Sequence, residues 1–458
     1  MDIALYWQWG LVIVSSGILY LISPLARSKE SFFSGLSDSD RQPGLLVLTF
    51  SLVISWLFAK SIANAANLGM SFGIVGGFAY ATYYFSFLVA GVIIYHMRRS
   101  GGVQSLHTFL QGKFGRGAMV IFSLVVSIRL LNEVWSNAAV IGSYFGAGGS
   151  PGYIAAVLVF TGLTLAYSLK GGLRSSLITD MVQMVLFGVL LFVILGIIIP
   201  KQGSVTPFLT SGNWTMANGL NLLFVAAIQV FSYPFHDPVL TDRAFISDEK
   251  TTLRSFLLAT VIGFACILLF SFVGIYGGFL GLSGQAAVEV SQTFGLGMML
   301  ITNFIMITSA ASTLDSTFSS VAKMAVVDWQ GKRRGITLSR GRWVMAITAM
   351  GGLIPLLFAP EIISATTVSG TMVLGFAPVF LFWKWPAPRI SFHLSMWTGI
   401  VAGLVLALGW VPESLYLTDG KYADLFAVNV YATVISFTGY LLPMAVRRHG
   451  PATVSATK

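Results

Sequence analysis

The chain has 458 residues, of which 55% are hydrophobic and 10% are charged, whereas a soluble globular protein carries roughly 25% charged residues. Too little polar material is present to cover a globule, and the single cysteine, Cys266, excludes a disulfide scaffold. The net charge of +10 is typical of Lys and Arg held in the cytoplasmic loops of a membrane protein, so the composition indicates an all-α polytopic membrane protein and argues against nucleic-acid binding.

Thirteen segments are apolar enough to cross a bilayer, which takes about 20 residues in a helix. In chain order they are residues 4–23, 44–68, 73–97, 118–145, 153–168, 176–199, 220–237, 255–280, 297–322, 343–358, 365–382, 392–411 and 425–445. The fifth and tenth spans are short, and we expect their helices to continue into the flanking residues.

Positive charge falls in every second loop. With the N-terminus outside, the cytoplasmic loops and the C-terminal tail hold 23 of the 27 Lys and Arg residues. External loops hold two, Lys201 and Lys421, and two lie within spans, Lys60 and Arg129. Because one missed helix would invert every later loop, we expect thirteen transmembrane helices, with the N-terminus outside and the C-terminus inside.

An odd helix count leaves room for two inverted five-helix repeats, since the second repeat must enter the bilayer from the opposite side. We expect an extra helix and a cytoplasmic loop in 1–43, the first repeat in 44–200, the second in 201–384, and two further helices with a cytoplasmic tail in 385–458. The first helix of each repeat is expected to break. The second span ends in ANAANLG, and the seventh contains Pro234 and Pro238 in YPFHDP. Paired interruptions mark transporter binding sites, although Pro and Gly are common in membrane helices generally.

Ionisable side chains inside a bilayer cost about 3 kcal/mol or more, so each needs a reason. Arg129 and Glu133 lie four residues apart in the fourth span and share a helix face, which fits either a structural pair or a role in transport. Lys60 has no acidic residue nearby on its own helix and lies deep in the second span. We expect it to face the central cavity, as a substrate contact or as a charge that balances or replaces an ion.

Two carboxylates stand out in later spans. Asp180, near the start of the sixth span, fits either a favourable interaction with the helix dipole or a cation ligand. Asp315 lies inside the ninth span, in ITSAASTLDSTFSSVAK, where serines recur at helical spacing. Such hydroxyls can bond to their own or to neighbouring helices, but a hard cation such as sodium prefers several oxygen ligands. The pattern therefore predicts a cation site on the ninth span.

Signatures of soluble enzymes are absent from the sequence. It contains no P-loop, HExxH or CxxC motif, and its five histidines are scattered without metal-ligand spacing. We therefore expect neither an enzyme nor a cofactor.

Several segments resemble the sodium/solute symporter family, whose members carry proline, sugars, pantothenate and other vitamins, urea and organic acids. The strongest is GGLRSSLITDMVQ (171–183), which is similar to the family's GG…TD..Q signature, and STLDS (312–316) is similar to its sodium-binding stretch. DPVLTDRAFIS (237–247) and TFLQGKFG (108–115) resemble two further family segments, and the Arg129–Glu133 spacing occurs in relatives. These matches follow the family order and cover the second to ninth spans.

The resemblance implies a five-plus-five inverted-repeat fold and sodium-coupled alternating access. It implies a principal sodium site formed by the backbone carbonyls of Ile54 and Leu57 and by oxygens of Ser309, Ser312 and Thr313. A second candidate sodium site comprises Asp180, Ser312, Asp315 and Ser316. Candidate substrate contacts are Lys60, Ser61, Tyr233 and His236. Ala79 stands where sugar carriers have a glutamate, which disfavours sugar, and Lys60 replaces a small residue, which favours an anion.

The leading hypothesis is a sodium-coupled secondary active symporter that imports a small organic solute, with a weak preference for an anion. It would be a multi-pass protein of the plasma (inner, cytoplasmic) membrane that needs the lipid bilayer but no obligatory protein partner, and its only ion would be sodium. One alternative is a proton-coupled or uncoupled carrier on the same fold, for which Lys60 and Asp315 would be the relevant groups. Another is a membrane sensor, which would require a separate output partner.

Overall fold

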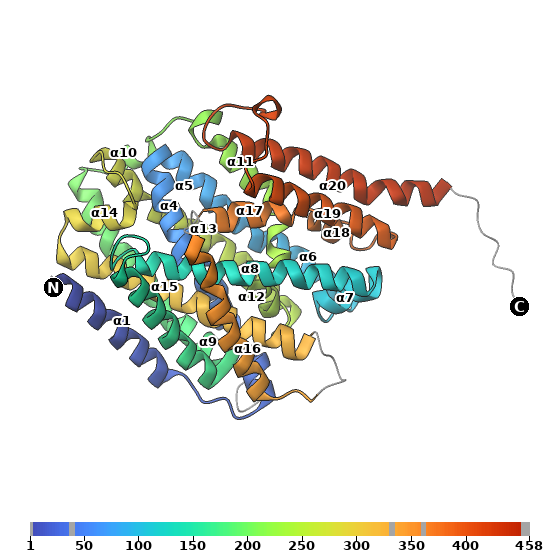
Figure 1. Cartoon of the computed structure of the whole chain (residues 1–458), viewed down its shortest axis with the longest axis horizontal. Helices are drawn as coiled ribbons and strands as arrows, with labels where there is room; N and C mark the ends of the chain where they lie inside the picture. The colour runs from blue at the N-terminus through green and yellow to red at the C-terminus, as the bar shows by residue number, and fades with distance from the viewer. Residues whose placement is uncertain (1–2, 36–41, 329–334, 359–362, 450–458) are drawn as a thin grey trace, which may run out of the picture.

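The computed structural model describes residues 3–35, 42–328, 335–358 and 363–449, and the regular elements within these ranges are all helical. α1 (Ile3–Ile22) begins at one end of the molecule, and α20 (Ala423–His449) extends to the opposite end (Figure 1). Between them the helices form one bundle around a continuous apolar core.

The helix bounds follow the expected spans closely. The first part of the chain contains α2 (Lys29–Ser34), α3 (Leu45–Trp56), α4 (Ala59–Phe72), α5 (Ile74–Ala81), α6 (Phe85–Gly101), α7 (Leu106–Phe114), α8 (Arg116–Gly142) and α9 (Pro151–Lys201). The second part contains α10 (Thr206–Leu209), α11 (Leu220–Gln229), α12 (Pro238–Arg243), α13 (Glu249–Phe279), α14 (Ala286–Thr293), α15 (Leu296–Lys323), α16 (Leu338–Gly352), α17 (Ser364–Met372), α18 (Phe376–Leu381) and α19 (Arg389–Ala407).

Fewer helices than expected are long enough to cross a bilayer unaided. In the described ranges nine pass a length and hydropathy criterion, and the bent pair α3–α4 makes a tenth. The difference from thirteen arises because α9 contains both the fifth and the sixth expected span. In addition, the seventh and eleventh spans are divided into short pieces, α11 with α12 and α17 with α18. One long bent helix and two divided spans therefore make up the difference of three between the ten spans of the structure and the thirteen expected.

α9 bends at a glycine. Its 51 residues would extend about 76 Å at 1.5 Å per residue, more than twice the roughly 30 Å of a hydrocarbon core. Gly172 has φ 57° and ψ −142°, and the helix changes direction there. Only glycine adopts this conformation without strain, and a Cβ would lie 2.4 Å from the Phe32 carbonyl oxygen. The GG pair of the sequence motif thus separates the two expected spans.

The second span breaks, but at a different point from the one expected. α3 ends at Trp56 and α4 begins at Ala59, with an angle of 59° between them, whereas the ANAANLG segment lies inside α4. Side chains satisfy the backbone groups freed by the break. The Tyr84 hydroxyl donates to the Trp56 carbonyl over 2.5 Å, and the Lys60 amide donates to Asn137 Oδ1 over 3.2 Å. Tertiary hydrogen bonds therefore stabilise the break between Trp56 and Ala59, and the small polar residues of ANAANLG do not predict its position.

The seventh span breaks where its prolines predict. α11 ends at Gln229, a short 3₁₀ turn covers Tyr233–His236, and α12 starts at Pro238. Proline has no backbone N–H to donate, and Asp237 caps the new helix by accepting from the amides of Val239 and Leu240 over 2.9 and 3.4 Å. The chain therefore restarts as a helix directly after the break.

Glycines bring α4 close to α13. A Cβ on Gly274 would lie 1.7 Å from the Ala66 carbonyl oxygen, and one on Gly69 would lie 2.4 Å from the carbonyl oxygen of Ser271. Small residues permit this approach of two membrane helices. The second half of the broken span is thereby held against the long helix α13.

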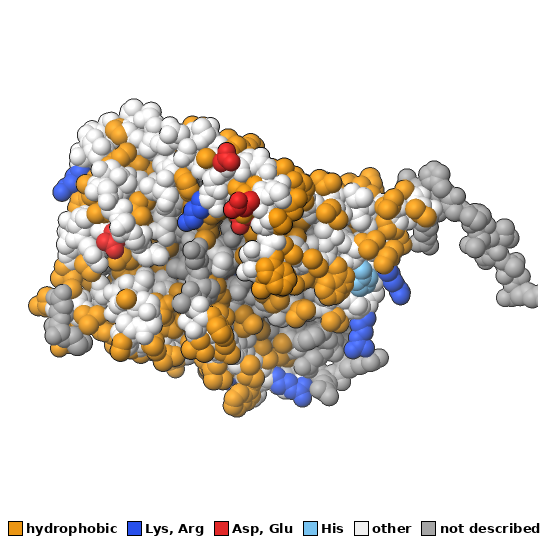
Figure 2. Space-filling model, turned by 45° about the horizontal axis from the view of Figure 1, so that its top comes forward, with side chains coloured by type: hydrophobic (Ala, Val, Ile, Leu, Met, Phe, Trp, Pro, Cys, Tyr) orange, Lys and Arg blue, Asp and Glu red, His pale blue; other side chains and the backbone are white. Residues whose placement is uncertain are grey.

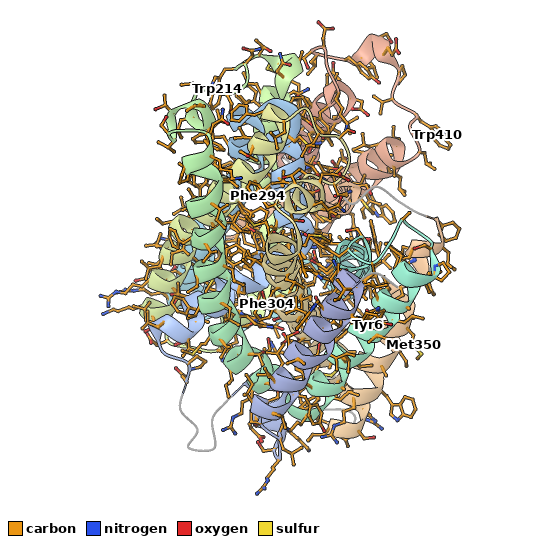
Figure 3. The ribbon with its side chains drawn as sticks, turned by 90° about the vertical axis from the view of Figure 1, so that its left-hand side faces the viewer. Tyr6, Trp214, Phe294, Phe304, Met350 and Trp410 are labelled. Carbon is orange, nitrogen blue, oxygen red and sulfur yellow. The ribbon has the colours of Figure 1, made fainter. Side chains whose placement is uncertain are left out.

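The outer surface fits a lipid environment. Hydrophobic side chains cover much of the lower and right-hand parts of the face shown in Figure 2, and charged ones are few. Tyr6 and Met350 are exposed, at 61% and 65%, and Trp214 and Trp410 lie in the upper part of the view in Figure 3. Tryptophans near a bundle end are typical of the membrane interface.

Candidate functional site

Four charged side chains meet in the middle of the bundle. On α8, Arg129 forms an ion pair with Glu133 one turn away. Glu133 also accepts from the ammonium of Lys60 over 2.6 Å, and Arg129 Nη2 lies 3.1 Å from Asp237 Oδ2. All four side chains are buried. This tetrad holds two positive and two negative charges, so it is balanced as a unit.

Lys60 therefore has a partner that its own helix does not supply. It is fully buried, as its depth in the span predicts, and its ammonium lies 5.0 Å from the ring centroid of Phe58. Its carboxylate partner, Glu133, is 73 residues away in the sequence. Because this contact compensates the positive charge, the structure does not support the expected preference for an anion.

Asp237 connects the two broken helices. Its Oδ2 atom accepts from the indole N–H of Trp56 over 2.8 Å, at the end of α3. Its Oδ1 atom caps α12. One carboxylate thus joins the interruption of the second span to that of the seventh, and Arg129 offsets its charge.

Beside this tetrad lies a small aromatic cavity. It is lined by Trp56, Phe58, Ser61, Tyr80, Tyr83, Tyr84, Tyr233 and Thr366. These residues come from the second, third, seventh and eleventh expected spans. The free volume is about 10 Å³, which is enough for one water molecule, so the cavity is almost closed.

The four candidate substrate contacts divide into two groups. Ser61 and Tyr233 line the aromatic cavity. Lys60 belongs to the charge tetrad. The ring of His236 packs edge-to-face against that of Tyr233, with the ring centroids 4.8 Å apart and the ring planes at 85°. The Nδ1 atom of His236 is 2.5 Å from the Tyr233 carbonyl oxygen, and its Nε2 atom has no hydrogen-bond partner in the described part of the chain.

A second buried polar cluster surrounds Asp180 on α9. Its Oδ1 atom accepts from Ser312 over 2.5 Å, and its Oδ2 atom accepts from Ser51 over 2.5 Å and from Ser55 over 3.3 Å. Ser55 in turn lies 3.1 Å from Ser316. The structure thus brings three of the residues named for the second candidate sodium site, Asp180, Ser312 and Ser316, to one place between α3, α9 and α15.

Arg243 enters this cluster from α12. Its Nη2 atom lies 3.0 Å from Asp180 Oδ2 and 2.9 Å from Ser316 Oγ, and its Nε atom lies 2.6 Å from Ser51 Oγ. A guanidinium is a cation with several donors in a fixed plane. It therefore fills part of the space in which the sequence predicts a second sodium ion.

Asp315, the fourth residue of that set, has no cationic partner among the described residues. Its Oδ2 atom accepts from Thr179 over 3.0 Å, and Ser316 donates to its Oδ1 atom over 3.3 Å. The side chain is 1% exposed. Arg243 contacts Asp180 but not Asp315, so the carboxylate of Asp315 has no counter-charge among the described residues.

The residues of the principal candidate sodium site lie where α15 packs against α3 and α4. Ile54 is in the last turn of α3 and Leu57 is in the break; no hydrogen bond to either carbonyl is found in the described ranges. The Ser309 hydroxyl is buried without a partner there, and the Thr313 hydroxyl donates to the Ser309 carbonyl over 2.9 Å. Ser312 differs, because its hydroxyl is bonded to Asp180.

Three members of the Asp180 cluster were not anticipated from the sequence. Ser51 and Ser55 lie four residues apart and so share one face of α3, a signal that the sequence does contain. Arg243 lies in the DPVLTDRAFIS segment, but nothing in that segment shows which carboxylate it meets. Its position depends on the break before α12.

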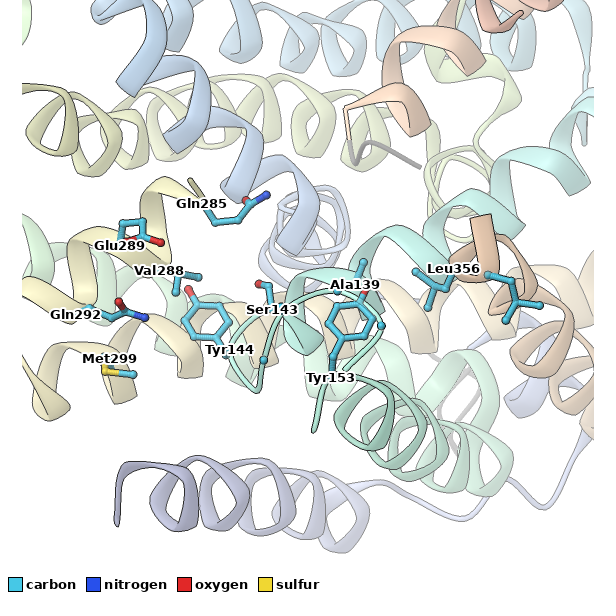
Figure 4. A pocket seen from close by; sticks show the side chains of 15 residues that line it. Ala139, Ser143, Tyr144, Tyr153, Gln285, Val288, Glu289, Gln292, Met299 and Leu356 are labelled. Carbon is cyan, nitrogen blue, oxygen red and sulfur yellow. The ribbon is translucent and has the colours of Figure 1, made fainter. Parts of the chain in front are cut away.

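Two larger cavities open at the end of the bundle that the sequence places outside. One, of about 830 Å³, separates Gln285, Glu289 and Gln292 from Ser143 and Tyr144 (Figure 4). The other, of about 310 Å³, is lined in part by Asn64, Asn67 and Gln285.

The second of these outer cavities adjoins the aromatic cavity. Asn67 Nδ2 donates to Gln285 Oε1 over 3.0 Å, and Asn64 Nδ2 lies 3.3 Å from the Tyr80 hydroxyl. Asn64 therefore stands between an open cavity and the closed one, on the external side of the tetrad.

Comparisons with known proteins identify the fold. No family model matches the chain, and no curated protein matches it. A sodium-coupled sialic acid symporter, solved in a substrate-bound outward-open state with a novel sodium site, has a TM-score of 0.71 at 13% identity, over 97% of each chain.

Two other transporters have the same fold. Mhp1, a nucleobase-cation-symport-1 family transporter, solved closed with bromovinylhydantoin bound, has a TM-score of 0.56 at 12% identity, over 93% of this chain and 96% of that one. MhsT with L-phenylalanine has a TM-score of 0.55 at 15% identity, over 92% and 99%. Mhp1 is also known in an inward-facing conformation, with a TM-score of 0.55 at 13% identity, over 92% and 96%. The chain thus shares the fold of these transporters, and membership of the sodium/solute symporter family stays a prediction.

Proposed function

We propose that this protein is a sodium-coupled secondary active symporter that imports a small organic solute by alternating access. The observation that carries the proposal is the meeting of two interrupted helices at Trp56 and Asp237, deep in a fold of sodium-coupled transporters. Broken helices at the midplane offer unpaired backbone groups to a solute and an ion. The outward-open and inward-facing states of structural neighbours support the alternating-access part.

The coupling sodium would bind between the break of the second span and α15. Its ligands would be the carbonyls of Ile54 and Leu57 and the hydroxyls of Ser309, Ser312 and Thr313. The Ser309 hydroxyl, which has no partner among the described residues, supports this site, because buried polar atoms are rarely left without a partner. Sodium would stabilise the outward-facing conformation that accepts the solute.

Coupling to protons is the second candidate, and Asp315 favours it. This carboxylate is buried with one negative charge more than Arg243 can offset. A single sodium ion or a single proton would restore neutrality. Asp180, Ser312, Asp315 and Ser316 are therefore a site for one monovalent cation of either kind.

For the topology we propose thirteen crossings, with the N-terminus outside, and the two repeats in 44–200 and 201–384. The bend at Gly172 and the divided seventh and eleventh spans support thirteen over ten. The residues 1–43 and 385–458 would flank the repeats. The location that we propose for this multi-pass protein is the plasma (inner, cytoplasmic) membrane.

Sodium binding can be tested before the solute is known. Purified protein should unfold at a higher temperature in sodium chloride than in choline chloride at equal ionic strength, because a ligand that binds only the folded state stabilises it. Ser309→Ala should reduce this sodium-dependent shift. Stabilisation by acid pH alone, with no effect of sodium, would favour the proton-coupled candidate.

A further inference from the structure

We infer that the aromatic cavity takes a small, uncharged solute that carries a flat ring. This inference rests on the proposed function, since it names the class of solute that the same site would transport. Two observations support it. Aromatic side chains line most of the cavity, and the charged side chains nearby are not part of its lining.

Aromatic rings form most of the wall. Tyr233 lies between Trp56 and Tyr83, with ring centroids 5.8 and 5.6 Å away, and Tyr83 is 5.6 Å from Tyr80. The Trp56 and Tyr233 planes are nearly perpendicular, at 88°. Flat apolar groups gain from stacked or edge-to-face contact with such rings. A branched or fully hydroxylated solute would gain far less from the same wall.

No ionised side chain contributes to this wall among the described residues. The nearest charges, those of Lys60, Arg129, Glu133 and Asp237, contact one another. A charged solute would lose its hydration and find no free counter-charge, which is costly in a buried site. The balance of the tetrad therefore selects against anions and cations alike.

A few hydrogen-bonding groups lie at one side of the cavity. The Tyr80 hydroxyl lies 3.2 Å from Ser61 Oγ and 3.4 Å from Thr366 Oγ1. The Tyr233 hydroxyl is buried and makes no hydrogen bond among the described residues. Hydroxyl groups can donate or accept. They suit the ring edge of a solute that has one or two polar atoms.

The nearly closed state of the cavity restricts size. The solute would enter from the outer cavity at Asn64 and would have to displace ring side chains, because only about 10 Å³ is free. A single six-membered ring with small substituents fits this requirement better than a disaccharide or a peptide.

The test is a binding panel of matched compounds, measured by calorimetry on the purified full chain in sodium chloride. Uracil, thymine and nicotinamide are uncharged and planar, nicotinate is the anionic counterpart of nicotinamide, phenylalanine is a zwitterion, and glucose is uncharged but not flat. We expect a planar uncharged compound to bind at least tenfold more tightly than nicotinate, phenylalanine or glucose. Tighter binding of a charged compound or of glucose, or no binding of any planar compound, would overturn the inference.

Two variants of Tyr80 separate the ring from its hydroxyl. Tyr80→Leu should weaken binding of the planar compound about tenfold, whereas Tyr80→Phe, which keeps the ring, should retain most of it. Equal losses in both variants would point to a polar contact and contradict a flat-ring site. Tyr6→Leu, on the exposed surface, controls for loss of a tyrosine.

Repeating the panel in choline chloride distinguishes the two proposals. A preference for planar uncharged compounds that needs no sodium would leave the solute class standing and contradict sodium coupling. Sodium-dependent binding of nicotinate would support sodium coupling and contradict the proposed solute class.

Discussion

Arg243 Nη2 donates a hydrogen bond to Asp180 Oδ2 over 3.0 Å, and both side chains are completely buried. The contact joins α12, which follows the break of the seventh span, to α9, which carries the TD..Q motif. Asp180 therefore has a structural partner as well as its proposed role in cation binding. The Asp180 Oδ2 atom accepts from Arg243, which is the structural contact. Its Oδ1 atom accepts from Ser312, a residue of the proposed sodium site.

Asp180→Asn should therefore affect both stability and coupling. Removing one partner of a buried ion pair costs about 3–5 kcal/mol, so the thermal midpoint should fall together with the apparent sodium affinity. The double variant Asp180→Asn/Arg243→Gln should recover much of the stability, because no buried charge is left alone, but not the sodium affinity. Recovery of both in the double variant would contradict a role for Asp180 in coupling.

Ser309→Ala is expected to weaken sodium binding without lowering the stability of the sodium-free protein. The Ser309 hydroxyl has no partner among the described residues, so its loss breaks no hydrogen bond. The sodium concentration that gives half-maximal stabilisation should rise severalfold, as it should in Ser312→Ala and Thr313→Ala. Ser320, also buried and unpartnered on α15, supplies the matched control. Wild-type sodium dependence in all three site variants would place the ion elsewhere.

Lys60→Met should destabilise the protein by about 3 kcal/mol or more, because Glu133 and Asp237 would outnumber Arg129 in a buried site. Lys60→Met/Glu133→Gln should restore part of this loss. Solute preference between nicotinamide and nicotinate should not change in the double variant, in which Arg129 and Asp237 still balance one another. A selective loss of nicotinate binding would show instead that Lys60 serves an anionic solute.

Gly274→Ala should disturb the packing of α13 on α4. Its Cβ would lie 1.7 Å from a backbone oxygen that no side-chain rotation can move, and overpacking of this kind typically costs about 1–3 kcal/mol or more. Gly162→Ala on α9, where nothing lies within 4 Å, should be neutral or slightly stabilising. The comparison requires only thermal midpoints in detergent, and equal midpoints would contradict the close approach.

The sequence predicts local features of this fold better than its contacts. Hydropathy locates the long apolar helices but not the short helices α2, α7, α10 and α14. Pro234 and Pro238 locate one break, because proline lacks a backbone N–H at its own position. The other break, at Leu57 and Phe58, depends on hydrogen bonds from Tyr84 and Asn137, which only the folded bundle brings near.

The candidate site follows the same rule. Ser312 was expected beside Asp180 from motif resemblance, and the structure places them in contact. The Lys60–Glu133 and Arg243–Asp180 pairs join residues 73 and 63 positions apart, and helical spacing predicts contacts only three or four residues away. For that reason the sequence shows no partner for Lys60, and the anion preference that it predicts is not supported once Glu133 is seen to contact the ammonium.

The most direct measurement of the central claim is uptake of ²²Na⁺ into proteoliposomes containing the purified protein, started by adding each compound of the solute panel outside. We predict that a compound that binds will stimulate sodium entry above the rate in its absence, and that Ser309→Ala will reduce this stimulation at limiting sodium while Ser320→Ala will not. Transport of the same compound with no stimulated sodium entry, accompanied by acidification of the lumen, would contradict sodium coupling.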